Sequence, residues 1–251
     1  MDTAHPGSRF RVRRVDETGS TNADALEAAA NGEPEGLVIV ADHQTAGRGR
    51  LGRTWVAPPG CSLLMSVVLR PPNEAGHLPV CAVGCAAAAA SARVAGAAVG
   101  LKWPNDLVAG GRKLGGILAE ASASSGNVTA LVVGLGLNVR LPAELPSELR
   151  ETATALDQLG APVTVDVLLA AILDELEPRY ARLCAAGPAE LIEEYRDRCL
   201  TIGQRVRVEQ PNETWSGDAV AIDDDAALIV ERPGVGRVRV DVGDVVHLRP
   251  Q

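Results

Sequence analysis

Apolar positions along the chain change their spacing near residue 200. Before that point, short apolar runs alternate with segments whose apolar residues recur at helical spacing. The pattern predicts strands over 10–15, 37–41, 63–69, 101–103, 107–109, 113–120 and 129–139, and helices over 23–30, 77–98, 165–185 and 189–199. Beyond it, the pattern predicts short strands over 202–208, 214–222, 226–231, 237–240 and 245–248. We therefore expect two domains, 1–200 and 201–251, the second a small β-barrel.

Local signals mark the turns between these elements. Ser20-Thr21-Asn22 offers capping side chains to the first helix. Gly110-Gly111 has the composition of a two-residue hairpin turn, which would bring Asp106 and Lys113 together on adjacent antiparallel strands. The segment His43–Gly60 is rich in Gly, Arg and Pro, so we expect it to be irregular.

Charge limits the classes of partner. The net charge of −8 makes nucleic acid a poor default partner, and we expect no DNA binding. Of the 24 basic residues, only Lys102 and Lys113 are lysines. In a chain that otherwise uses arginine, these two positions are candidates for chemistry that needs a compact ammonium group.

The cysteines and the amino terminus indicate the compartment. Five cysteines occur without the spacing of a zinc site, and no apolar core of a signal peptide is present. The run Val80–Ala92 is mostly alanine and is expected to be too short to span a bilayer. These features predict a cytoplasmic protein with no membrane association and no protein metal site.

A glycine- and arginine-rich segment carries the first candidate chemistry. Gly47–Gly52 matches G-x-G-x-x-G, but Arg53–Pro59 cannot form the helix that a dinucleotide-binding fold requires. Arg48, Arg50 and Arg53 on this backbone could converge on carboxylate and phosphate oxygens. A mobile basic surface loop is the alternative.

Two further segments combine polar residues with glycines in predicted strands. Lys102-Trp103-Pro104-Asn105-Asp106 lies at a strand end, and Gly115-Gly116 and Gly134-Leu135-Gly136 lie within strands. Glycine weakens a strand unless something must lie against its backbone, which favours a ligand there. A hairpin with a surface ion pair is the alternative.

Taken together, these motifs resemble those of biotin protein ligases. The matching segments are STN at 20–22, QTAGRGRLGRTW at 44–55, KWPND at 102–106, RKLGGIL at 112–118 and GLGLNV at 134–139. The resemblance covers about residues 15–200 and the small C-terminal barrel. It implies an α+β fold, in which a mixed β-sheet catalytic domain with flanking helices, like those of class II synthetases and lipoate ligases, precedes an SH3-like β-barrel.

The resemblance also implies the reaction. An ATP-dependent ligase would activate biotin as biotinyl-5′-AMP and transfer it to a lysine of a biotin carboxyl carrier protein domain. With few residues before STN, we expect the monofunctional class without a DNA-binding domain, as a monomer or weak homodimer. Lipoate attachment is the alternative within the fold, and a non-catalytic binding protein is the alternative outside it.

Site residues follow from the matched motifs and the chemistry. Lys113, Asp106 and Arg50 are expected to be catalytic, with Lys113 bridging the biotin carboxylate and the α-phosphate. The expected biotin-binding residues are Ser20, Thr21, Asn22, Gln44, Gly47, Arg48, Gly49, Arg50, Lys113, Gly115 and Gly116. The expected ATP and adenylate contacts are Arg48, Arg50, Arg53, Trp55, Asn105, Lys113 and Asn138. Mg²⁺ would be carried by the ATP phosphates.

Overall fold

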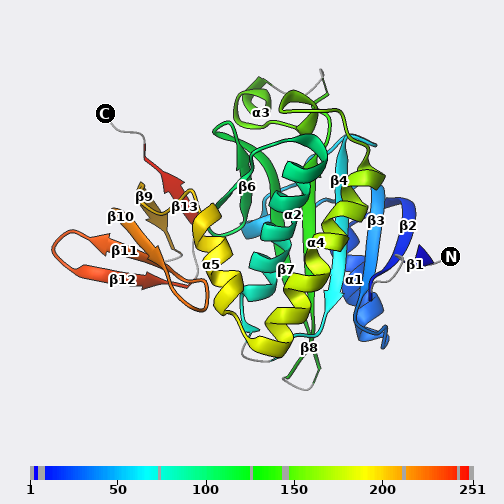
Figure 1. The fold of residues 1–251 in the computed structure, drawn as a ribbon, viewed down its shortest axis with the longest axis horizontal. Coiled ribbons are helices and arrows are strands. Elements are labelled where there is room, and N and C mark those ends of the chain that lie inside the picture. Colours follow the sequence, from blue (N-terminus) through cyan, green and yellow to red (C-terminus); the bar gives the residue numbers. More distant parts are fainter. Residues whose placement is uncertain are drawn as a thin grey trace.

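The computed structural model describes residues 3–4, 9–72, 75–124, 127–142, 147–210, 213–241 and 244–248. An eight-stranded sheet with the order β1-β2-β3-β4-β8-β7-β6-β5 forms its centre (Figure 1). β2 and β3 pair in parallel and the other neighbours are antiparallel, so the predicted mixed sheet is confirmed. The strands are β1 (Thr3–Ala4), β2 (Arg11–Thr18), β3 (Leu37–Gln44), β4 (Ser62–Leu69), β5 (Gly100–Lys102), β6 (Asp106–Ala109), β7 (Arg112–Ser124) and β8 (Asn127–Asn138).

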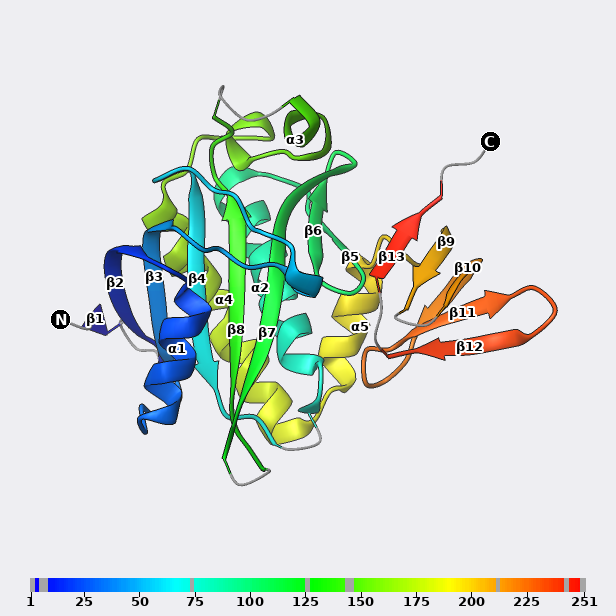
Figure 2. The same cartoon turned by 180° about the vertical axis from the view of Figure 1, so that it is seen from behind.

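Helices cover the two faces of this sheet unequally. α2 and α4 cover one face, whereas α1 lies alone on the other (Figures 1 and 2). The helices are α1 (Thr21–Ala30), α2 (Leu78–Ala95), α3 (Ser147–Thr152), α4 (Val165–Ala186) and α5 (Ala189–Arg198), with single 3₁₀ turns η1 (Arg50–Gly52) and η3 (Leu156–Gln158). The face with the single helix is therefore open enough to hold a ligand.

α2 forms the centre of the main core. Its alanines are almost all buried, which allows close packing against both the sheet and α4. Its 18 residues are long and apolar enough to cross a membrane, contrary to the expectation that this segment is too short. However, 78% of the helix is buried inside the protein, and this burial identifies it as a core helix.

An irregular segment crosses the open face of the sheet. Residues 45–61, here called the strap, leave β3, pass over β8 and β7 to η1, and return to β4 (Figure 2). Inside the strap, an isolated antiparallel bridge joins Arg48 to Thr54 and thus pairs its outgoing and returning limbs. The prediction that this segment is largely irregular is confirmed.

The C-terminal part is a five-stranded antiparallel sheet with the order β12-β11-β10-β9-β13. Its strands are β9 (Arg205–Glu209), β10 (Thr214–Ile222), β11 (Leu228–Arg232), β12 (Gly236–Val240) and β13 (Asp244–His247). It joins the larger part through buried polar contacts: the Trp103 indole Nε1 donates to the Ala226 carbonyl at 2.9 Å. Trp103 N also donates to Thr201 Oγ1 at 3.0 Å.

Several element boundaries differ from the sequence-based prediction. α1 begins at Thr21, so Thr21 and Asn22 lie in its first turn instead of preceding it. α2 ends at Ala95 because Gly96 adopts a left-handed conformation with φ of +67°. β9 starts later than predicted, after the turn at Thr201. The hairpin turn at Gly110-Gly111 is confirmed, with φ values of +57° and +74°.

Candidate active site

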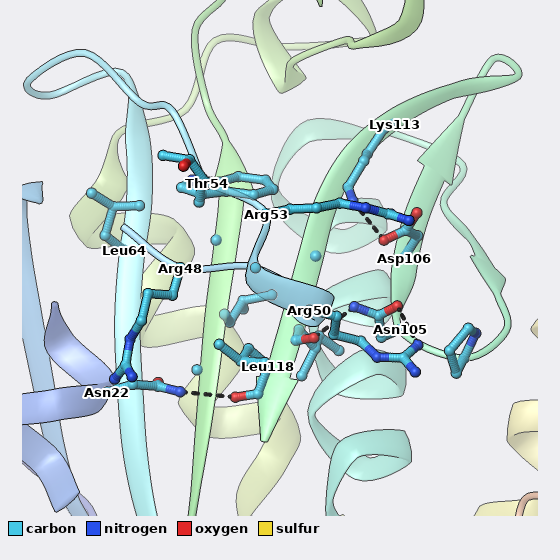
Figure 3. A pocket seen from close by; sticks show the side chains of 18 of the residues that line it. Asn22, Arg48, Arg50, Arg53, Thr54, Leu64, Asn105, Asp106, Lys113 and Leu118 are labelled. Carbon is cyan, nitrogen blue, oxygen red and sulfur yellow. Dashed lines mark hydrogen bonds and ion pairs between the residues drawn. The ribbon is translucent and has the colours of Figure 1, made fainter. Parts of the chain in front are cut away.

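A cavity of about 220 Å³ lies between the strap, the start of α1 and the sheet (Figure 3). Its walls come from segments that are distant in the sequence, including Gln44 at the end of β3 and Val245 and Val246 of β13. The predicted site residues that line it are Ser20, Thr21, Asn22, Gln44, Arg48, Gly49, Arg50, Arg53, Trp55, Asn105, Asp106, Lys113 and Gly116. The fold thus gathers most of the predicted set around one cavity.

One end of the cavity is closed by a buried polar network. Thr21 donates from both its backbone N and its Oγ1 to Gln44 Oε1, at 2.7 and 2.9 Å. Ser66 Oγ lies 2.7 Å from Thr21 Oγ1 and 2.6 Å from Asn22 Oδ1. This end therefore offers both donors and acceptors, as a small ring with N–H and C=O groups requires.

The same network reaches the strap. Asn22 Nδ2 donates to the Leu118 carbonyl at 3.1 Å and to Glu120 Oε2 at 2.7 Å. The other oxygen of Glu120 forms an ion pair of 3.1 Å with Arg48 Nη1. In Figure 3 the Arg48 side chain points toward Asn22 and away from Lys113. Gly134 makes room for Asn22, since a Cβ there would lie 2.1 Å from Asn22 Oδ1.

Glycines form the floor of the cavity beneath the strap. Gly116 on β7 and Gly136 on β8 are direct partners in the sheet. The Trp55 ring lies against both, and a Cβ at Gly136 would come within 2.6 Å of it. Trp55 Nε1 is buried and has no hydrogen-bond partner among the described residues. We expected Trp55 to contact ATP; in this structure its ring covers the glycine floor.

At the other end, Lys113 and Asp106 form the predicted pair across the hairpin. Lys113 Nζ lies 2.6 Å from Asp106 Oδ1, and it is 5.8 Å from the centre of the Trp55 ring. Figure 3 shows Arg53 reaching from the strap toward the same two residues. Cationic groups from a strand and from the strap thus converge beside one carboxylate, an arrangement suited to binding anions.

Asn105 connects the strap to β7 near this end. Its Oδ1 accepts from Arg50 Nη1 at 3.3 Å, and its Nδ2 donates to the Ile117 carbonyl at 2.8 Å. His77 Nε2 lies 3.3 Å from the Pro104 carbonyl in the same turn. Burial lowers the pKa of His77, and the nearby Arg50 charge lowers it further. A neutral His77 therefore supports the turn that carries Asn105.

A second hollow of about 240 Å³ adjoins the first. Thr54, Trp55 and Lys113 line both spaces, so these side chains form the wall between them. Asn138 lines only the second hollow, where its Oδ1 accepts from Ser62 Oγ at 3.2 Å. The structure therefore separates Asn138 from Asn105, although we expected both to contact one nucleotide.

Two other expected biotin contacts, both glycines, do not line the cavity beneath the strap. A Cβ at Gly47 would lie 2.6 Å from the Trp55 carbonyl, so this glycine permits the two limbs of the strap to approach each other. A Cβ at Gly115 would lie 2.7 Å from the Gly136 carbonyl, between neighbouring strands. In this structure both glycines serve close backbone packing.

Sequence reasoning missed Ser66, Glu120 and the two valines of β13. A signal for two of them was present. Ser66 is a polar residue inside the otherwise apolar run of β4, and Glu120 shares the strand face of Gly116 by alternation. Val245 and Val246 had no such signal, because their position depends on how the C-terminal sheet docks. Among the described residues, no group of three or more potential metal ligands is present.

Comparisons with known proteins agree with the motifs. Residues 13–138 match the biotin/lipoate A/B protein ligase family, and residues 201–248 match the biotin protein ligase C-terminal domain. The chain is 43% identical to the biotin–[acetyl-CoA-carboxylase] ligase of Mycobacterium tuberculosis, over 94% of this chain and 88% of that protein. It is 33% identical to the ligase of the same name from Paracoccus denitrificans, over 91% and 97% of the two chains.

A solved structure has a similar fold over nearly the whole chain. The biotin protein ligase from Aquifex aeolicus in complex with biotin and ATP superimposes with a TM-score of 0.81 at 25% identity. The superposition covers 95% of this chain and 99% of that one. The likeness thus includes both the large sheet and the C-terminal sheet.

Proposed function

The chain belongs to the biotin/lipoate A/B protein ligase family as an ATP-dependent biotin ligase, and we propose that the cavity beneath its strap is where biotin becomes biotinyl-5′-AMP. The acceptor in the second step would be a lysine of a biotin carboxyl carrier domain, in keeping with the names of the relatives. We propose 1–200 and 201–251 as the two functional domains.

The observation that carries this proposal is the position of Lys113. Its side chain lines both the cavity beneath the strap and the second hollow. Biotin in the first and the nucleotide in the second would therefore meet at one ammonium group. That meeting point is where the reaction brings two anions together.

The first step joins the biotin carboxylate to the α-phosphorus of ATP. A carboxylate oxygen attacks the phosphorus, the bond to the bridging oxygen breaks, and pyrophosphate leaves with the electron pair. The charge of Lys113 would offset the crowding of the two anions, while Asp106 at 2.6 Å keeps the ammonium oriented. Arg50 and Arg53 would supply further positive charge from the strap. When bound, Mg²⁺ would screen the outer phosphates.

The polar end of the cavity would hold the ureido ring of biotin. Ser20, Thr21 and Gln44 provide donors and acceptors there, and the acyl chain would run from that end of the cavity toward Lys113. The shielded position beneath the strap would protect the mixed anhydride from water until an acceptor lysine arrives.

The remaining expectations concern partners and place. We propose that no nucleic acid takes part, since a net charge of −8 opposes binding to a polyanion. We also propose a monomer or weak homodimer in the cytoplasm, where the five cysteines would stay reduced as they are in this structure.

Release of pyrophosphate from Mg-ATP tests the proposed reaction. We expect release to require biotin and to be absent with lipoate, and we expect label from biotin to appear on an added carrier domain. Release that depends on lipoate and not on biotin would assign the chain to the other branch of the family. Binding of biotin with no release of pyrophosphate would point to a non-catalytic protein.

A further inference from the structure

We propose that Glu120 is a positioning residue, which holds the strap closed over the cavity through its ion pair with Arg48. The inference rests on the proposed function, because it concerns how biotin and its adenylate are retained. Glu120 does not line the cavity in the described part of the chain. It acts on the ligand only through the residues it holds.

A single carboxylate here joins three separate elements. Glu120 extends from β7, its Oε2 accepts from Asn22 on α1 at 2.7 Å, and its Oε1 pairs with Arg48 on the strap at 3.1 Å. Its side chain is 26% exposed and that of Arg48 is 43% exposed, so the pair is only partly screened by water. The strap is thereby fastened to the polar end of the cavity.

The contact at Arg48 extends to the rest of the strap. The backbone of Arg48 forms an isolated β-bridge with Thr54 on the returning limb, and Gly49 N donates to the Arg53 carbonyl at 2.7 Å. Fixing Arg48 therefore also fixes the limb that carries Arg53 and Trp55 into the cavity. Because Trp55 covers the glycine floor, release of Arg48 would loosen the cover of the whole cavity.

This arrangement changes the role expected for Arg48. We expected its guanidinium to bind phosphate and carboxylate oxygens, but here it faces Glu120 and points away from Lys113 (Figure 3). With one of the three strap arginines neutralised by Glu120, like-charge repulsion within the strap is reduced. Arg50 and Arg53 remain on the side of the cavity where the anions would meet.

The test compares Glu120→Gln with a matched control, Glu33→Gln. Glu33 pairs with Arg11 at 2.9 Å, has a similar exposure of 22%, and lies outside the cavity lining. For Glu120→Gln we expect biotin to dissociate about tenfold faster, because the substitution weakens one hydrogen bond to a charged group. Amide exchange across residues 45–61 should also accelerate without any ligand. The KM for ATP should rise as well, because the same limb carries Arg53 and Trp55, and the control should change none of these.

A double-mutant cycle gives a second criterion. In an Arg48→Met background, Glu120→Gln should add less than about twofold to the dissociation rate, because the partner is already gone. If Glu120→Gln lowers the melting temperature, Glu120→Asp retains the charge, and its release rate should fall between those of the wild type and Glu120→Gln.

The outcomes separate this inference from the proposed function. Unchanged amide exchange in the strap of Glu120→Gln, with unchanged biotin release, overturns the role of Glu120. If Glu120→Gln speeds biotin dissociation equally in the wild-type and Arg48→Met backgrounds, the role of Glu120 is overturned as well. A wild-type chain that binds no biotin overturns the proposed function, while the ligand-free exchange measurement still tests Glu120.

Discussion

The Lys113 ammonium lies 2.6 Å from the Asp106 carboxylate, on the wall between the two cavities. Removing the ammonium group by Lys113→Ala should slow biotin-dependent pyrophosphate release by a factor of about 10²–10³. This is the usual effect of losing one preorganised charge that stabilises a transition state. Biotin should still bind, since the polar groups assigned to its ring lie at the opposite end of the cavity.

The measurement is pyrophosphate release together with the biotin dissociation constant. Arg112→Ala is the matched control, because Arg112 precedes Lys113 on β7 but lines neither cavity. Near-normal pyrophosphate release by Lys113→Ala would remove Lys113 from its proposed role. A comparable loss in the control would mean that the end of β7 had been disturbed.

At the scale of elements, the strap combines contacts that hold it with a composition that opposes order. Arg50 is held to Asn105, and Trp55 covers the glycine floor, yet three arginines and several glycines share this short segment. We expect residues 43–60 to exchange amide hydrogens readily in the empty protein. Protection should increase with biotin and again with biotin plus Mg-ATP, because the adenylate phosphate offsets the charge of the arginines.

Hydrogen exchange with and without ligands measures this directly, and β12, at the edge of the C-terminal sheet opposite β13, supplies an internal reference. Equal protection of residues 43–60 in all states would mean that the strap is preformed. In that case the intermediate would be guarded by a rigid cover and not by closure on the ligand.

A related prediction concerns leakage of the intermediate from beneath the strap. Arg50→Gly removes the contact with Asn105 and, in the proposed function, one cation that would face the adenylate phosphate. We expect about tenfold or more labelling of an unrelated lysine-rich protein by the variant, because the mixed anhydride escapes before transfer. Arg50→Lys retains the charge, so this variant should release less of the intermediate. Equal labelling by the wild type and Arg50→Gly would contradict this account.

At the scale of the whole molecule, a chain of hydrogen bonds crosses the seam between the two sheets. Trp103 N donates to Thr201 Oγ1, and that hydroxyl lies 3.0 Å from His247 Nε2 on β13. Since the hydroxyl oxygen already accepts from Trp103, its proton is available to a neutral imidazole. Burial lowers the pKa of His247, and the charge of Lys102 lowers it further.

This seam should make stability depend on pH. With a folded-state pKa below the ordinary histidine value of about 6.5, the unfolded chain takes up the proton first as the pH falls. The free energy of unfolding should therefore be undiminished above about pH 6.5 and should decrease as the pH falls from there toward the lowered pKa. His247→Gln retains an acceptor for Thr201 without the charge, and it should reduce this decrease.

Urea unfolding at pH 7.5 and 5.5 compares the wild type, His247→Gln and the surface control His43→Gln. The contribution of His77, which is also buried with a lowered pKa, remains in all three proteins. An unaltered pH dependence in His247→Gln would show that the imidazole at the seam does not titrate in this range.

The features that the sequence alone determined are those that depend on near neighbours in the chain. Apolar spacing placed α4, and Gly110-Gly111 placed the hairpin that brings Asp106 to Lys113, because those two residues are only seven positions apart. The motifs also identified most of the cavity lining, since each motif is a short segment whose residues lie close together. Local periodicity and turn chemistry carry this information.

Only the tertiary structure decided which of these segments meet. The contact between Asn22 and Glu120 spans 98 residues, and it exists because α1 packs across β8 and β7 on the open face of the sheet. The bond from Trp103 to Ala226 spans 123 residues and depends on how the C-terminal sheet docks. Strand order, the choice of sheet face and domain docking are set by long-range packing. The ion pair between Arg48 and Glu120 was therefore not predicted from the sequence.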